Sequence, residues 1–172
     1  MRREGITDFR RVWFVKGGTK SQALNLTPYV QELNKLYDPR RPLDLTEADL
    51  GGLEAEGIDL RGSKLLLTNL ESANLRGADL SFCNLLRTRL SYASLYGANL
   101  RVTRLSEVWL NEALCLEGLK ESDLPLDFGR FLKKFEGRVD YSLAAYEAHA
   151  RDTYRGSNRY DKYKNNRYKQ KP

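Results

Sequence analysis

The chain has 172 residues, of which 41% are hydrophobic and 30% charged, and its formal net charge is +6. These values suit one soluble domain with extensions and favour an acidic partner: nucleic acid, an anionic membrane surface or an acidic protein. Two cysteines and one histidine exclude a disulfide framework and a metal cluster. No apolar run approaches the roughly 18 residues of a transmembrane helix, and none near the start suits a signal peptide. We therefore expect a cytoplasmic protein that uses neither a metal nor another cofactor.

The first 40 residues, 1–40, predict a short cap or arm with a net charge of +4. Residues 8–15 are rich in apolar side chains, which favours a strand. Thr27 suits the N-cap of a short helix and Pro28 its first position, and Pro39 ends that helix. We expect the strand and the helix to cover the first coil of the repeat that follows.

A repeat of five residues occupies the middle of the chain, residues 41–125. Thirteen of fifteen successive fifth positions are leucine. The series is Leu45, Leu50, Ala55, Leu60, Leu65, Leu70, Leu75, Leu80, Leu85, Leu90, Leu95, Leu100, Leu105, Leu110 and Cys115. The position two residues before each of these is small from Ser63 onward, and Asp or Asn is common between the two. A period of five fits neither a helix nor a simple strand, but it fits a chain that turns a corner every five residues.

Such a chain places two inward side chains on each side, and four sides close a square coil of twenty residues. Three units show the motif: 73–77 (ANLRG), 78–82 (ADLSF) and 98–102 (ANLRV). They resemble the A-(D/N)-L-x-x motif of pentapeptide-repeat proteins, and the resemblance covers about residues 43–117. It implies an all-β core that folds as a right-handed quadrilateral β-helix, here of just under four coils. It implies little about function, because one fold serves many functions.

The twenty-residue period predicts columns of stacked side chains. One column should hold Leu45, Leu65, Leu85 and Leu105, and another Ala55, Leu75, Leu95 and Cys115. We expect Cys83 and Cys115 to point inward as buried, inert thiols. A stack of this kind exposes unpaired backbone at both ends, so the flanking segments should cap it.

Beyond Cys115 the register breaks, and residues 126–172 predict a helical cap followed by a basic tail. Four apolar residues at helical spacing predict an amphipathic helix: Phe128, Phe131, Leu132 and Phe135. Gly137 should end this helix, which we expect to cap the last coil. A second helix is predicted from Asp140 to about Tyr154.

The tail, residues 151–172, carries a net charge of +6 with four interleaved tyrosines. Such a tail can hold an acidic protein through charge-assisted bonds and tyrosine packing, can bind nucleic acid, or can remain disordered. We favour the acidic protein. The residues expected to bind it are Arg155, Arg159, Tyr160, Lys162, Tyr163, Lys164, Arg167 and Tyr168.

A second candidate surface is an outward apolar patch. The two positions after each central leucine should face solvent, and most of them are polar or glycine. The exceptions that group together are Leu66, Leu67, Phe82, Leu86 and Val102. In the twenty-residue frame Leu66 stacks on Leu86, and Phe82 stacks on Val102. Such a patch marks an interface, unless one of the chain's own arms covers it.

No group of residues in the sequence suggests catalysis. His149 is the one histidine of the sequence, is expected on a helix surface, and belongs to no motif that would make it a general base. We therefore expect a non-catalytic scaffold or linker protein that docks into a larger acidic assembly through its basic arms and the apolar patch. Light-harvesting antenna proteins are one partner that the resemblance suggests, and nucleic acid is a less expected one.

Some pentapeptide-repeat proteins imitate DNA and modulate a topoisomerase such as gyrase, which gives an alternative hypothesis. That role calls for a long, strongly acidic rod. The repeat segment 41–125 holds nine basic and thirteen acidic residues, a net charge of only −4. Outward arginines depart further from an acidic rod: Arg61, Arg76, Arg87, Arg89, Arg101 and Arg104.

Overall fold

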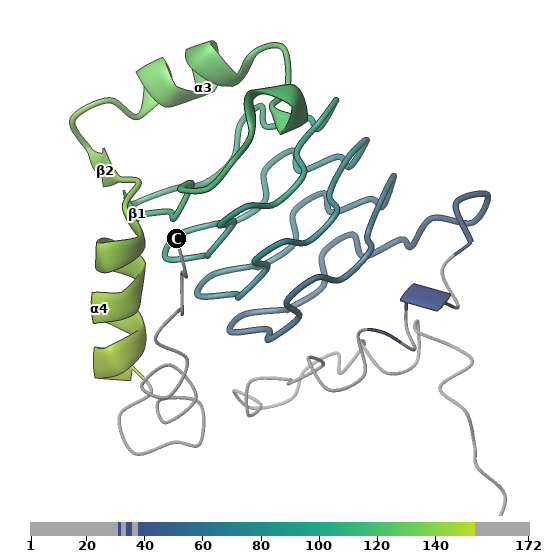
Figure 1. Cartoon of the computed structure of the whole chain (residues 1–172), viewed down its shortest axis with the longest axis horizontal. Coiled ribbons are helices and arrows are strands. Elements are labelled where there is room, and N and C mark those ends of the chain that lie inside the picture. Colours follow the sequence, from purple (N-terminus) through teal and green to yellow (C-terminus); the bar gives the residue numbers. More distant parts are fainter. Residues whose placement is uncertain (1–30, 32–33, 36–37, 154–172) are drawn as a thin grey trace, which may run out of the picture.

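The computed structural model describes residues 31, 34–35 and 38–153. The strand predicted at 8–15, most of the helix predicted from Thr27, and the tail residues 155–172 lie outside this part of the chain. The described part is a stack of rectangular coils, with helix α3 at one end and helix α4 along one flank (Figure 1).

The coils are held together by parallel backbone pairing at a spacing of twenty residues. The pairing begins at Asp44↔Lys64 and keeps this spacing up to Arg89↔Trp109. The backbone N–H groups of the central residues from Leu45 to Leu95 donate to carbonyls of the next coil, as from Leu65 to Asn84 at 2.9 Å. The predicted twenty-residue coil is therefore confirmed over residues 44–109.

The interior is lined by the predicted leucines. Leu65 and Leu85 are fully buried, and Leu105 nearly so, and each such side chain contributes roughly 1.5–3 kcal/mol to stability. The threonines at the small inward positions are hydrogen-bonded to the preceding coil. The hydroxyl of Thr68 donates to the carbonyl of Leu45 at 2.7 Å, and this spacing of 23 residues recurs along the stack.

Ser63, which lies at the end of the first coil, is an exception to this pattern. Its buried hydroxyl has no hydrogen-bond partner among the described residues. The same spacing would require the carbonyl of Arg40, but residues 39–41 form a turn before the ladder begins. The first coil therefore lacks the acceptor that every later inward hydroxyl of this kind needs.

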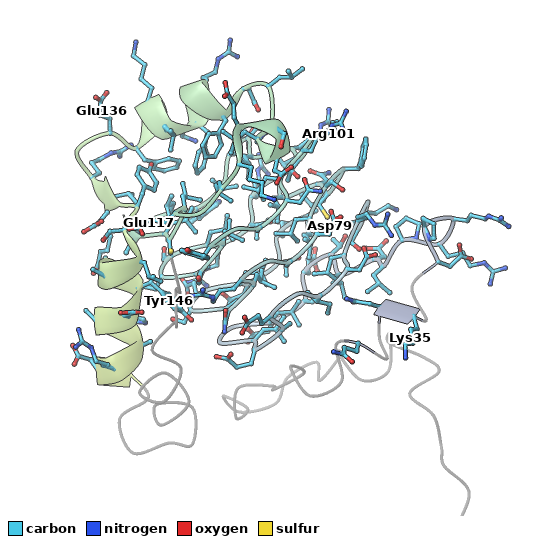
Figure 2. The ribbon with its side chains drawn as sticks, in the orientation of Figure 1. Lys35, Asp79, Arg101, Glu117, Glu136 and Tyr146 are labelled. Carbon is cyan, nitrogen blue, oxygen red and sulfur yellow. The ribbon has the colours of Figure 1, made fainter. Side chains whose placement is uncertain are left out.

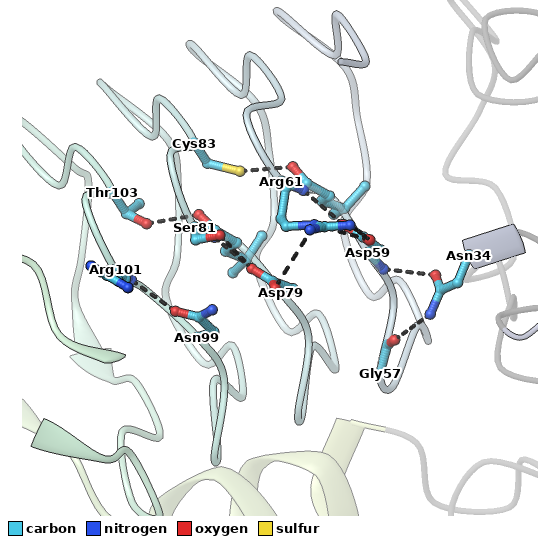
Figure 3. A network of polar contacts seen from close by, with 12 residues as sticks. Asn34, Gly57, Asp59, Arg61, Asp79, Ser81, Cys83, Asn99, Arg101 and Thr103 are labelled. Carbon is cyan, nitrogen blue, oxygen red and sulfur yellow. Dashed lines mark hydrogen bonds and ion pairs between the residues drawn. The ribbon is translucent and has the colours of Figure 1, made fainter. Parts of the chain in front are cut away.

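The side chain of Asn34 supplies backbone partners at the same lower edge. Its Nδ2 donates to the carbonyl of Gly57 at 2.8 Å, and its Oδ1 accepts from the N–H of Asp59 at 2.8 Å. Figure 3 shows these bonds at the outer coil, followed by the ladder from Asp59 through Asp79 to Asn99. The helical residues 34–35 thus contact the first coil.

Each corner of the coil is a turn whose third residue has a positive φ. The first and fourth residues of these turns are hydrogen-bonded, as from the N–H of Ala48 to the carbonyl of Leu45 at 3.1 Å. Glycine is favoured at this third position because it has no Cβ to clash. Gly62 and Gly77 follow this preference, whereas Phe82, at φ 60, does not.

The prediction of an unbroken register as far as Cys115 is wrong by one residue. Ser94 pairs with Cys115, a spacing of 21 residues, and the N–H of Cys115 donates to the carbonyl of Ala93 at 3.0 Å. Cys115 therefore lies between the two inward positions and not in the leucine column. The shift places Leu114 and Leu116 where Ala113 and Cys115 would otherwise stand, which buries more apolar surface.

The extra residue lies in strand β1, Glu112–Ala113, where Glu112 has a φ of 64. β1 pairs in parallel with strand β2, Val139–Asp140. The pairing continues from the N–H of Leu114 to the carbonyl of Asp140 at 3.0 Å. A returning segment of the chain, which the sequence did not predict, therefore covers this side of the last coil.

Both predicted C-terminal helices are present. Helix α3 is Phe128–Lys134, preceded by the short 3-10 helix η2, Glu121–Asp123, which was not predicted. Phe131 and Phe135 are buried and pack in the same cluster as the repeat leucines. Helix α4, Leu143–Thr153, begins three residues later than predicted, because Asp140 belongs to β2.

No helix in the described part of the chain combines the length and the apolar character needed to cross a bilayer.

Candidate interaction surface

Two apolar side chains are stacked on one corner of the coil, as the sequence predicted. Phe82 is 62% exposed and Val102 is 53% exposed. The N–H of Phe82 donates to the carbonyl of Arg101 at 2.9 Å, so the two turns lie in adjacent coils. Both residues have positive φ, 60 and 58, which costs a bulky residue about 1–2 kcal/mol. We call this pair the Phe82 corner.

A second apolar group lies on the next corner. Leu67 is 44% exposed, whereas Leu66 and Leu86 are less exposed and half-buried. The N–H of Leu67 donates to the carbonyl of Leu86 at 3.1 Å, which places these turns one above another. Of the five residues predicted for the patch, three are therefore well exposed. We call this group the Leu67 corner.

The side of the coil between these two corners carries outward polar residues, namely Asp44, Lys64, Asn84 and Arg104. In the lower coils the charges are paired, since Lys64 lies 3.5 Å from Asp44. Arg104 is exposed and has no ion pair among the described residues. We call this side, with the Phe82 and Leu67 corners, the open side.

Arg101 adds a second cation without a carboxylate partner at the upper end of the open side. Its backbone N–H donates to Asn99 Oδ1 at 3.0 Å, but its side chain makes no ion pair within the described residues. Figure 2 shows Arg101 projecting outward near η2. Arg61, two coils below on the same corner, differs because it is bound to Asp59 at 2.7 Å.

A pocket of about 470 Å³ lies where α3 meets the last coil. Leu105 and Phe131 contribute apolar walls, and Glu107 and Asp127 contribute acidic groups. The basic lining residues are Arg130, Lys133 and Lys134. Sequence reasoning missed this pocket, because the position of α3 is not visible in a repeat pattern. It predicted that Arg101 and Arg104 face outward, but it could not show that they differ from the other outward arginines in their ion pairing.

The opposite side of the coil is covered. Its outward residues Glu54, Asn74 and Ser94 are buried, and the amide of Asn74 donates to Glu54 at 2.8 Å. Helix α4 lies along this flank, and its Tyr146 is almost fully buried (Figure 2). The open side, in contrast to the side covered by α4, is an exposed lateral surface.

The expectation that His149 lies on a helix surface is wrong. Its ring stacks on Tyr92 with centroids 3.7 Å apart, and its Nε2 lies 2.9 Å from the hydroxyl of Ser72. Burial lowers the pKa of His149 below its usual 6.5, although Glu112 and Asp152 oppose that shift. The histidine fixes α4 against two adjacent coils.

Neither cysteine is an activated nucleophile. Burial raises the pKa of the Cys83 thiol to about 12, and its Sγ donates to the carbonyl of Leu60 at 2.9 Å. Burial also raises the pKa of Cys115. Within the described residues, no group of three or more His, Cys, Asp or Glu side chains could hold a metal ion.

A parallel ladder of twenty-residue coils with a leucine-lined interior defines a β-helical solenoid. The family model for pentapeptide repeats matches this segment in eight copies, over residues 44–81 and 68–106. The central segment of the chain, residues 44–106, thus carries pentapeptide repeats.

Several solved structures are similar to the chain. A pentapeptide-repeat protein from the cyanobacterium Cyanothece 51142 is 32% identical over 40% of this chain and 50% of its own, with a TM-score of 0.32. HetL from the cyanobacterium Nostoc sp. strain PCC 7120, involved in heterocyst differentiation regulation, is 33% identical over 44% of this chain and 36% of its own, with a TM-score of 0.27. The chain thus spans about half and about a third of these two proteins.

A pentapeptide-repeat protein of the Arabidopsis thaliana thylakoid lumen is 21% identical over 65% of this chain and 94% of its own, with a TM-score of 0.36. No protein with a curated description matches the sequence.

Proposed function

We propose that this chain is a non-catalytic scaffold or linker that docks into a larger acidic assembly. The observation that carries the proposal is the open side. There, exposed apolar residues in unfavourable turn conformations stand beside arginines that form no ion pair with any residue that the structure describes. Large exposed apolar side chains of this kind are typical of interaction surfaces.

The distribution of charge along the sequence supports an acidic partner. Residues 1–40 carry +4 and residues 126–172 carry +6, whereas residues 41–125 carry −4. Basic arms on a rigid body would be drawn to an acidic complex and would lose that attraction at high salt. The tail residues from Arg155 to Tyr168 remain the proposed contacts of the C-terminal arm, and a cytoplasmic location remains part of the proposal.

The alternative, a DNA-mimicking modulator of gyrase, calls for continuous acidic rows on the outside of the coil. In the described coils, basic residues interrupt these rows and pair with the acids. Arg87 lies 2.8 Å from Glu107, and Arg89 lies 3.0 Å from Glu71. The alternative therefore has less support than the scaffold function.

The test is fractionation of a native extract by size, with the full chain added at low and at high salt. A matched variant keeps the tail length but replaces every Lys and Arg of residues 155–172 by Gln. We expect the full chain to migrate with a large acidic complex at low salt only, and the tail variant to migrate alone. The full chain running alone at low salt would contradict the scaffold function.

A supercoiling assay separates the alternative. If the purified chain alters supercoiling by gyrase, and if the tail variant does so equally, the DNA-mimicking function is favoured and the tail-dependent scaffold function fails. Light-harvesting antenna complexes are a suitable first assembly to test in the fractionation.

A further inference from the structure

We propose that the open side and the pocket beside α3 form one docking surface for an acidic polypeptide segment in which carboxylates flank an apolar side chain. This inference rests on the proposed scaffold function. It adds the location of the contact and the chemistry of the segment that the partner must present.

The parts of the surface are continuous along a single coil, residues 101–107. Val102 forms one corner, Arg104 projects from the side, and Glu107 occupies the next corner. Leu105, between the last two, points inward and contributes to the pocket. An extended segment that crosses the open side would therefore meet an apolar corner, a cation and a pocket in succession.

The charges of the open side and of the pocket favour a carboxylate-bearing ligand. Arg101, Arg104 and Arg130 have no ion pair within the described residues. Glu107 is already engaged by Arg87 at 2.8 Å. These guanidinium groups can donate paired hydrogen bonds to carboxylates, which is the geometry that Arg provides best.

The apolar residues of the surface have a strained backbone, and the burial of their side chains within the fold does not offset that strain. Phe82 and Val102 both hold positive φ and remain more than half exposed. Val102 is branched at Cβ, which makes a positive φ a clear outlier. Observed strain of this kind is a reason to suspect a function for the residues that bear it. Burial of these side chains by a partner would release free energy that offsets the cost of the strained backbone.

The pocket suits an apolar side chain of the partner. Its volume of about 470 Å³ lies within the range of small binding sites. Leu105 and Phe131 line it, and the cations stand around them. An apolar anchor that enters a pocket while charged neighbours stay at the rim is the usual arrangement of an interface hot spot.

A polypeptide fits this surface better than nucleic acid. Glu107 and Asp127 line the pocket and would repel a continuous phosphate backbone, whereas a polypeptide can place its carboxylates away from them. The chain's own arms also fit poorly, because residues 1–40 and 126–172 carry the same sign of charge as the arginines.

The experiment selects binders of the purified full chain from a random linear-peptide library and measures their affinity by fluorescence anisotropy. Two variants probe the surface: Phe82→Gly with Val102→Gly, and Arg101→Gln with Arg104→Gln. Arg151→Gln, on the exposed face of α4, is the matched control. Thermal melting verifies that each variant is folded.

We expect the enriched peptides to combine acidic residues with an apolar one. Each surface variant should weaken their binding about tenfold or more, and Arg151→Gln should leave it unchanged. Enrichment of basic or uncharged peptides, no enrichment, or equal binding to all variants would overturn the proposal. So would displacement of the peptide by a DNA duplex, or self-association of the chain that the glycine variant abolishes.

The same variants separate this inference from the scaffold function. If the full chain and the double-glycine variant join the acidic complex equally, the complex is real and the docking surface is wrong. If the full chain does not join any complex, the scaffold function itself fails.

Discussion

At the scale of single residues, the third position of each turn sets a local conformational cost. The chain must adopt a positive φ there in every described coil. Gly77 adopts it without strain, whereas Val102 adopts it at about 1–2 kcal/mol. The same backbone feature is therefore inexpensive at some corners and costly at others, and the costly corners can be tested one residue at a time.

Val102→Gly should raise the free energy of unfolding. Glycine removes the strain at φ 58, and its greater freedom in the unfolded chain offsets only about 0.5–1 kcal/mol of that gain. The side chain is 53% exposed, so little burial is lost. Urea denaturation should show a net stabilisation of roughly 0.5–1 kcal/mol.

Gly77→Val provides the reverse experiment. A Cβ at residue 77 would meet nothing within 4 Å, and φ is +60. The substitution therefore introduces strain without a clash and should destabilise by about 1–2 kcal/mol. If Val102→Gly destabilises instead, then Val102 packs against the fold and its strain is not evidence of an external partner.

The inward hydroxyls give a second residue-scale test. Thr88 is buried and its hydroxyl donates to the carbonyl of Leu65, whereas the buried hydroxyl of Ser63 has no partner among the described residues. Thr88→Val should cost about 1 kcal/mol in urea denaturation. Ser63→Ala should be neutral or stabilising, because it removes an unsatisfied group. A similar loss of stability in both variants would contradict the account that an inward hydroxyl stabilises the fold only where a carbonyl lies 23 residues before it.

At the scale of elements, α4 is joined to the coil by His149. The imidazole contacts Tyr92 and Ser72, which lie on successive coils. The neutral ring suits this contact, because burial disfavours its charged form. Protonation should therefore loosen α4, and with it the origin of the basic tail.

This contact predicts a dependence of stability on pH. The folded pKa of His149 lies below the usual 6.5, so the unfolded chain binds more protons as pH falls below about 6.5. Stability should fall as pH decreases through 6.5 towards the folded pKa. The carboxyls of Asp44 and Asp140, whose pKa values lie below 3.8 because of hydrogen bonds from Thr46 and Ser142, lose their contribution only at lower pH.

Hydrogen exchange of α4 at pH 7 and pH 5.5 measures the effect. Exchange within Leu143–Thr153 should accelerate at the lower pH, relative to the coil amides. His149→Gln should remove most of the difference between the two conditions. Equal protection of α4 at both pH values in the unaltered chain would refute the role of His149.

At the scale of the whole molecule, the sequence predicted the regular parts and missed those that depend on distant contacts. The leucine period predicted the coil, and aromatic spacing predicted α3, because both signals are local. The shift before Cys115 was missed because Leu114 and Leu116 allow either register. The choice between the two registers accompanies the pairing of β1 with β2. β2 lies 27 residues further along the chain than β1.

The candidate surface shows the same division. Phe82 and Val102 could be predicted, since the twenty-residue frame places them outward and adjacent. Arg104 looked like any other outward arginine, and only the ion pairs show that it differs from Arg87 and Arg61. The pocket needed the position of α3 over Leu105, which no repeat pattern contains.

The central claim is that the open side contacts an acidic partner. The most direct measurement replaces Phe82 by a photo-crosslinking phenylalanine analogue, irradiates the native assembly, and identifies the linked peptide by mass spectrometry. The same analogue at Ala144, exposed on α4, is the control. We predict a crosslink from position 82 to an acidic segment of another protein, and none to that segment from position 144. A crosslink from position 82 to the chain's own arms or to a second copy would contradict the claim.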